Sequence, residues 1–262
     1  MEYGISTSCF YPMPLRQAAG HIAEWGVPAC EVFVNTFSEL TAEFTCELRR
    51  LFDQSGTRVV SVHPFTSGME PLMFFSDYTT RASDSIELYK HFFEAAAALG
   101  AEYFVFHGDR KESRFDPRRG WERFAALDDA ARSFGLRAAQ ENVSRCMSGR
   151  TDYIVSMRRY LRGDVCFVLD VKQCIRAGSS VPDMLGAMGP CLRHVHISDS
   201  DALHDCLPVG KGDFDFHGFI GSLAAAGYDG ALITELYHDN YSSLEELRGS
   251  LDTLKKRLGE SV

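Results

Sequence analysis

The sequence lacks an uninterrupted apolar stretch that approaches the roughly 18 residues of a membrane-spanning helix. The opening Met1-Glu2-Tyr3-Gly4 also lacks the charged-then-apolar pattern of a secretion signal. No CxxC pair occurs, although the chain has eight cysteines, several of them inside apolar runs. Such cysteines usually behave as small buried apolar residues and stay free thiols in a reducing compartment. We therefore expect a cytoplasmic protein with no membrane partner.

An excess of positive charge is absent as well. The chain has 36 acidic and 27 basic residues, which gives a formal net charge of −9. Proteins that hold nucleic acid through phosphate contacts usually carry the opposite balance. The composition therefore disfavours a nucleic-acid partner.

A glycine-rich phosphate turn does not follow the first predicted strand. The turn reads Cys9-Phe10-Tyr11-Pro12-Met13-Pro14, which contains no glycine. A doubly wound open sheet normally has such a turn at this point. This open sheet is the competing architecture, and the missing glycines favour a barrel over it.

What the chain does have is a regular alternation of apolar β-type runs and amphipathic helical segments. The predicted strands lie near residues 4–10, 29–35, 58–64, 103–108, 137–142, 166–171, 193–198 and 230–236. The predicted helices lie near residues 14–26, 44–56, 82–99, 119–134, 150–161, 180–188, 215–227 and 243–258. Alternation with short links requires parallel strands and right-handed crossovers. We predict an α/β fold, a (β/α)8 TIM barrel, as a single domain over residues 1–262.

Six of the predicted strands end at one ionisable side chain. These residues are His63, His107, Glu141, Asp170, His196 and Glu235. In a parallel barrel the carboxyl ends of the strands converge on one mouth, where such folds do chemistry. We therefore expect these six side chains to lie around one site.

Four of these positions together predict a metal site. Glu141, Asp170, His196 and Glu235 follow four successive strands. Three carboxylates and one imidazole suit one divalent ion, Mn²⁺ or Mg²⁺ first and Co²⁺ or Zn²⁺ second. Without a cation these carboxylates would repel one another. Each residue alone has an ordinary alternative as a capping, salt-bridging or core group.

Several motifs resemble the xylose-isomerase-like barrel superfamily. They are Gln140-Glu141-Asn142, Leu169-Asp170-Val171-Lys172-Gln173, His194-Val195-His196-Ile197-Ser198-Asp199, Pro208 to Phe214, and Gly227-Tyr228-Asp229-Gly230 followed by Thr234-Glu235. The superfamily contains sugar and sugar-phosphate isomerases and epimerases, related dehydratases, and DNA-repair enzymes of the endonuclease IV type. In its ketose 3-epimerases, residues that correspond to Glu141, Asp170, His196 and Glu235 bind one divalent metal. The resemblance also implies that Glu141 and Glu235 move the proton.

The chain departs from the DNA-repair branch of this superfamily. That branch has a second histidine after the strand-six aspartate, where this chain has Gln173, and its Asp-x-His is displaced by His204-Asp205-Cys206. An amide cannot replace an imidazole as a zinc ligand, which disfavours DNA repair. His63 and His107 are then expected to hydrogen-bond substrate hydroxyls or the groups that support the metal ligands. Further candidates for substrate contact lie just beyond strand ends or in the seventh loop: Lys172, Gln173, His204 and Lys211.

Together these features predict a metal-dependent sugar or sugar-phosphate isomerase or epimerase. A divalent cation would polarise the substrate carbonyl, and the two glutamates would transfer a proton through an enediolate. A keto-polyol dehydratase of the same fold and a non-catalytic sugar-binding barrel stay open as alternatives. The sequence leaves the sugar and the oligomeric state open, with a homo-oligomer as one option.

A basic segment follows His107. Five positive residues lie within residues 108–120, namely Arg110, Lys111, Arg114, Arg118 and Arg119. One hypothesis is that this segment attracts an anionic substrate. A solvated charged loop is the alternative interpretation.

Overall fold

The computed structural model describes residues 1–260 and shows a closed barrel of eight parallel strands in sequence order. The remaining residues of the predicted domain, 261–262, lie outside the described part. The strands are β1 (Glu2–Ser6), β2 (Ala29–Val34), β3 (Arg58–Pro64), β4 (Tyr103–Phe106), β5 (Arg137–Glu141), β6 (Cys166–Asp170), β7 (Leu192–Ile197) and β8 (Ala231–Thr234). β1 pairs with both β2 and β8, which closes the barrel. The predicted single-domain TIM barrel is confirmed.

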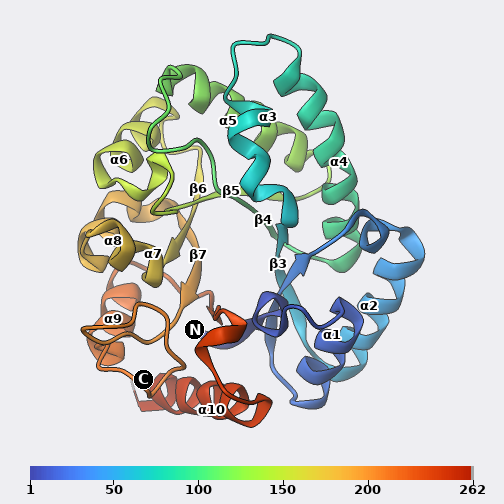
Figure 1. Cartoon of the computed structure of the whole chain (residues 1–262), viewed down its shortest axis with the longest axis vertical. Coiled ribbons are helices and arrows are strands. Elements are labelled where there is room, and N and C mark those ends of the chain that lie inside the picture. Colours follow the sequence, from blue (N-terminus) through green and yellow to red (C-terminus); the bar gives the residue numbers. More distant parts are fainter. Residues whose placement is uncertain (261–262) are drawn as a thin grey trace.

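Helices surround the strands (Figure 1). The α-helices are α1 (Leu15–Glu24), α2 (Ala42–Ser55), α3 (Glu70–Phe74), α4 (Arg81–Leu99), α5 (Pro117–Arg132), α6 (Thr151–Tyr160), α7 (Val171–Ala177), α8 (Val181–Met188), α9 (Phe216–Ala225) and α10 (Leu244–Glu260). Six short 3-10 helices are η1 (Thr7–Phe10), η2 (Phe37–Leu40), η3 (Phe65–Met69), η4 (Met147–Gly149), η5 (Gly189–Cys191) and η6 (His238–Asn240).

The first strand is shorter than predicted. It ends at Ser6 rather than at residue 10, because the chain turns there into η1. The Ser6 side chain accepts a hydrogen bond from the backbone N–H of Ser8, which caps this turn. Helix α7 was not predicted. It begins directly after β6, where the Asp170 side chain accepts from the N–H of Gln173.

Alternation along the strands places two kinds of side chain inside the barrel. Two small apolar clusters contain strand residues only, which places them within the barrel: Ala29, Val60, Ala231 and Ile233, and then Val105, Ala139, Cys166 and Val168. Two residues further along, the same strand faces carry ionisable groups, as in Ala139 and Glu141 or Ile233 and Glu235. The barrel is therefore apolar at its amino end and polar at its carboxyl end.

A much larger apolar cluster joins the outer strand faces to the helices. Phe104 and Phe106 of β4, for example, make ring contacts with Phe93 of α4 and Phe124 of α5. This packing fixes each strand end and thus the positions of the polar side chains there.

Within residues 1–260, no helix has the length and apolarity that crossing a membrane requires. The eight cysteines are free thiols, seven of them buried and Cys46 exposed.

Gly4 offers a test of the barrel interior. A Cβ at Gly4 would lie 2.4 Å from Ile233 Cδ1 and 2.5 Å from the carbonyl oxygen of Ala29 in β2. We expect Gly4→Ala to destabilise the protein by about 1–3 kcal/mol, because paired backbone cannot retreat from the added methyl group. Urea unfolding followed by circular dichroism measures the change.

Gly20→Ala is the matched control. Gly20 lies in α1, and a Cβ there would meet no atom within 4 Å. This substitution should stabilise the protein by about 0.5–1 kcal/mol through helix propensity. Equal effects of the two substitutions would contradict the close packing of β1 on β2 and β8.

Candidate functional site

The four predicted metal ligands meet at the carboxyl end of the barrel. Glu141 ends β5, Asp170 ends β6, His196 lies on β7, and Glu235 directly follows β8. One ligand atom from each lies within 4.8 Å of the others. His196 Nδ1 is 3.6 Å from Glu141 Oε1, 3.7 Å from Asp170 Oδ2 and 3.5 Å from Glu235 Oε2. The structure thus brings these four side chains to one common centre.

The His196 Nδ1 atom is a buried polar atom without a hydrogen-bond partner among the described residues. A buried polar group normally has a partner, because leaving it unpaired costs free energy. Here the unpaired nitrogen faces three carboxylate oxygens. This donor set fits a divalent cation that prefers oxygen ligands, as do Mn²⁺ and Mg²⁺.

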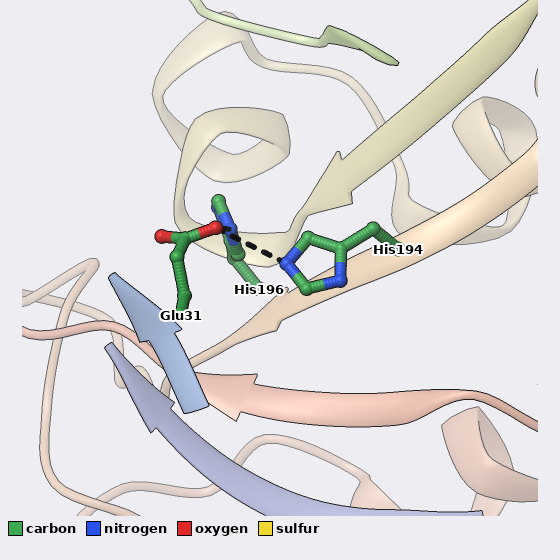
Figure 2. A group of neighbouring side chains, drawn as sticks. All are labelled: Glu31, His194 and His196. Carbon is green, nitrogen blue, oxygen red and sulfur yellow. Dashed lines mark hydrogen bonds and ion pairs between the residues drawn. The ribbon is translucent and has the colours of Figure 1, made fainter. Parts of the chain in front are cut away.

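The other nitrogen of His196 is held by a residue that was not predicted from the sequence. Glu31 of β2 is fully buried, and its Oε2 accepts from His196 Nε2 at 2.9 Å. His194 Nε2 lies 3.2 Å from the same oxygen, and Figure 2 shows the carboxylate directed at both rings. Ser61 and Ser6 donate to Glu31 at 2.8 and 3.1 Å.

Glu31 therefore fixes the orientation of His196. A carboxylate can only accept, so His196 Nε2 carries a proton and Nδ1 is directed at the mouth. Burial would raise the pKa of Glu31, but the charge and N–H groups of His196 and His194 outweigh it and hold that pKa well below 4.5. In the sequence, the feature that could have revealed Glu31 is its place as a charged residue within the otherwise apolar run Ala29–Val34.

The carboxylates at the mouth differ in their environments. Burial would raise the pKa of Glu141, but His107, His196 and His63 outweigh it and hold that pKa well below its usual range. Burial likewise acts against the charge of Glu235, and the Lys172 ammonium with His196 lowers its pKa below 4.5. Burial raises the pKa of Asp170, which Lys172 only partly offsets.

The predicted substrate contacts Lys172 and Gln173 lie within the site. The Lys172 ammonium donates to Asp170 Oδ2 and Glu235 Oε2. Gln173 Oε1 accepts from the backbone N–H and the hydroxyl of Ser144. The amide of Gln173 is thus engaged with the loop after β5.

His63 and His107 approach Glu141 from the side of β3 and β4. Their Nε2 atoms are 2.9 Å apart, and His107 Nε2 lies 2.9 Å from Glu141 Oε2. These three residues form a second group whose ligand atoms lie within 4.8 Å of one another. Glu70 of α3 supports this side by accepting from the N–H groups of His107 and Gly108, both at 2.8 Å.

A cavity of about 740 Å³ opens over these residues. Its walls include some of the titratable side chains described above and a set of aromatic and polar groups from the loops. Among the lining residues are His63, His107, Glu141, Lys172, Gln173 and Glu235, with Tyr11, Phe33, Asn35, Arg145, Tyr237 and His238. A mixed apolar and polar lining of this size suits a small polar molecule such as an open-chain sugar.

The other two predicted substrate contacts lie outside this lining. His204 is exposed and pairs with Asp201 at 2.9 Å, and Lys211 is exposed and pairs with Glu246 at 3.4 Å. Both belong to the long segment after β7, which hydrogen-bonds within itself.

The basic segment after His107 does not line the cavity either. All five of its positive residues are exposed. The guanidinium in the lining belongs to Arg145, which follows β5 and lies 3.2 Å from His107 Nδ1. Arg145 was not predicted from the sequence, because a single arginine in a loop carries no recognisable pattern.

Comparison with known proteins identifies the family. The model of the xylose isomerase-like TIM barrel family matches residues 20–257. An uncharacterized protein of Mycobacterium tuberculosis is 24% identical, over 96% of this chain and 94% of that protein.

Solved structures share the fold over at least 98% of the chain. A D-tagatose 3-epimerase-like protein superposes with a TM-score of 0.81 at 18% identity, covering 100% of this chain and 98% of that one. A 3-keto-D-glucoside 4-epimerase from E. coli gives a TM-score of 0.78 at 19% identity, covering 98% and 99%. At these identities the likeness establishes the barrel fold.

Glu31→Gln tests the buried network. We expect the variant to be less stable than wild type by about 2 kcal/mol near neutral pH, as hydrogen bonds to charged groups contribute roughly that much. The folded pKa of Glu31 lies well below 4.5, so its contribution is complete above pH 4.5 and is lost as the pH falls through the folded value. Urea unfolding of metal-free protein across this range measures the difference.

Exposed Glu47, which pairs with Arg16 on the surface, supplies the control. Glu47→Gln should change the stability little at any pH. If the difference in stability between wild type and Glu31→Gln stays constant as the pH falls below 4.5, the charge of Glu31 does not stabilise the fold.

Proposed function

Because the chain belongs to the xylose isomerase-like TIM barrel family, we propose that it is a divalent-metal-dependent isomerase or epimerase of a sugar or sugar phosphate. The observation that supports this function best is the meeting of Glu141, Asp170, His196 and Glu235 at one centre. Epimerases among the solved structures with this fold, including a D-psicose 3-epimerase, agree with it.

In this proposal Glu141, Asp170, His196 and Glu235 hold one cation, Mn²⁺ or Mg²⁺ in preference to Co²⁺ or Zn²⁺. The bound ion supplies a Lewis acid that polarises a substrate carbonyl. The remaining chemistry belongs to the side chains of the chain.

Glu141 and Glu235 are the proposed proton-transfer groups. They come from strands three positions apart around the barrel and both line the cavity. A substrate between them would present its α-carbon to one carboxylate on each side. One glutamate takes the α-proton to give an enediolate, and the other glutamate returns a proton to the same or the adjacent carbon. Return to the same carbon is epimerisation, and return to the neighbouring carbon is isomerisation.

His63 and His107 are proposed to orient the substrate by hydrogen bonding to its hydroxyl groups. Both line the cavity beside Glu141. The Phe33 ring stacks on His63 at a centroid distance of 4.8 Å, which holds the imidazole plane and adds an apolar wall. Such a wall suits the C–H face of a sugar.

Metal analysis and proton exchange test the proposal together. Purified protein should contain or bind about one divalent ion per chain. In D₂O the metal-loaded protein should introduce deuterium next to the carbonyl of at least one ketose or ketose phosphate in a panel. A metal-loaded protein that exchanges no proton in any of these sugars would favour a binding function instead.

Glu141→Gln and Glu235→Gln should each reduce exchange and turnover by about 10²–10⁴-fold at saturating metal, since each removes a general base or acid. Glu87→Gln on α4 is the control, because that side chain is exposed and pairs only with Lys90 in the described structure. Near-normal turnover in both site variants would refute the assignment of these glutamates.

A further inference from the structure

Lys172 is unusual because it is a buried lysine bound to two of the proposed metal ligands. It is the second residue of α7, with only Val171 between it and Asp170. The residue is 2% exposed although lysine is rarely buried. The ammonium donates to Asp170 Oδ2 and to Glu235 Oε2.

These two oxygens are the ones that face His196. The same Asp170 Oδ2 lies 3.7 Å from His196 Nδ1, and the same Glu235 Oε2 lies 3.5 Å from it. The ammonium therefore holds two of the donor atoms that the proposed metal site requires. A divalent cation bound to these oxygens would lie against the ammonium, and two neighbouring positive charges repel strongly in a buried site.

The charges explain why an ammonium lies there. Burial would lower the pKa of Lys172, but Asp170 and Glu235 outweigh burial and raise it well above 10.5. Without a positive partner the buried carboxylates would carry uncompensated charge, which is strongly unfavourable. The lysine ammonium can move away from these carboxylates, because a flexible chain of four methylene groups links it to the backbone.

The cavity offers the ammonium a second place. Lys172 lines the cavity, and its Nζ already lies 5.9 Å from the ring centroid of Tyr237, which is half-exposed at the rim. The face of an aromatic ring attracts a cation at this distance, and the same ring also contacts the Arg176 guanidinium, whose Cζ lies 5.1 Å from the centroid.

We infer that Lys172 is a built-in counter-cation of the metal-free site, and that a divalent metal binds by displacing its ammonium from Asp170 and Glu235 into the cavity. The displaced ammonium then faces the substrate and favours one with a negatively charged or strongly polar oxygen. This inference rests on the proposed function.

The first test is the affinity of metal-free protein for Mn²⁺, measured by isothermal titration calorimetry. An apparent affinity is reduced by the fraction of molecules in the competent conformation. If the ammonium leaves the carboxylates in about a tenth of molecules, Lys172→Met should bind Mn²⁺ about tenfold more tightly than wild type. Without metal the variant should also melt at a lower temperature, and Mn²⁺ should raise its melting temperature by more.

Lys256→Met on α10 is the matched control. Lys256 is exposed and pairs with Glu260, so this variant removes one positive charge far from the carboxylates. Its Mn²⁺ affinity should equal that of wild type. Equal or weaker binding by Lys172→Met would overturn the inference while leaving the proposed function intact, and absence of metal binding in both wild type and Lys172→Met would overturn both.

A second test uses the wild-type chain and does not depend on a folded variant. Reductive methylation followed by mass spectrometry reports how accessible each lysine amine is. Lys172 should react slowly in metal-free protein and faster with Mn²⁺, whereas Lys256 should react equally in both. An unchanged rate at Lys172 after Mn²⁺ has bound would show that the ammonium does not move.

Discussion

Four carboxylates gathered at one end of the barrel are the constraint on which the rest of the site depends. Glu31, Glu141 and Asp170 are buried and Glu235 is partly buried, and buried charges are tolerated only with partners of opposite charge. The partners come from other strands and loops: His196 from β7, His63 from β3, and Lys172 from the start of α7. Only a closed barrel brings these segments to one place, so fold and electrostatics support each other.

The positive partners of this cluster differ in how firmly they are held. His196 is fixed by Glu31 through Nε2, and Glu31 is itself held by two serines, so the imidazole presents Nδ1 in one orientation. Lys172 has a flexible stem and lines an open cavity. A fixed imidazole and a movable ammonium on the same carboxylates are what a site needs if it is to be preformed without metal and still accept one.

Predicting the barrel from the sequence succeeded because the signal is repeated eight times. Most strands carry a short β-branched or aromatic run, although β5 reads Arg-Ala-Ala-Gln-Glu, and small errors at one boundary, such as the early end of β1 at Ser6, do not change the topology. The expected convergence of Glu141, Asp170, His196 and Glu235 followed from the same rule, since parallel strands end at one mouth. Their catalytic and metal-binding roles stay predictions.

The sequence by itself determined the barrel, the apolar helix faces and the set of ionisable residues at the strand ends, because these follow from local periodicity and chain order. Only the tertiary structure decided that Glu31, in the middle of a strand, faces inward to His196. It also decided that Arg145 lines the cavity and the basic segment does not. His204 and Lys211 likewise lie outside the cavity lining. These facts depend on how strands tilt and loops fold across one another, which brings together residues as far apart as Glu31 and His196. Local sequence carries no record of such distances, because the burial and pairing of a charge are properties of the whole closed barrel.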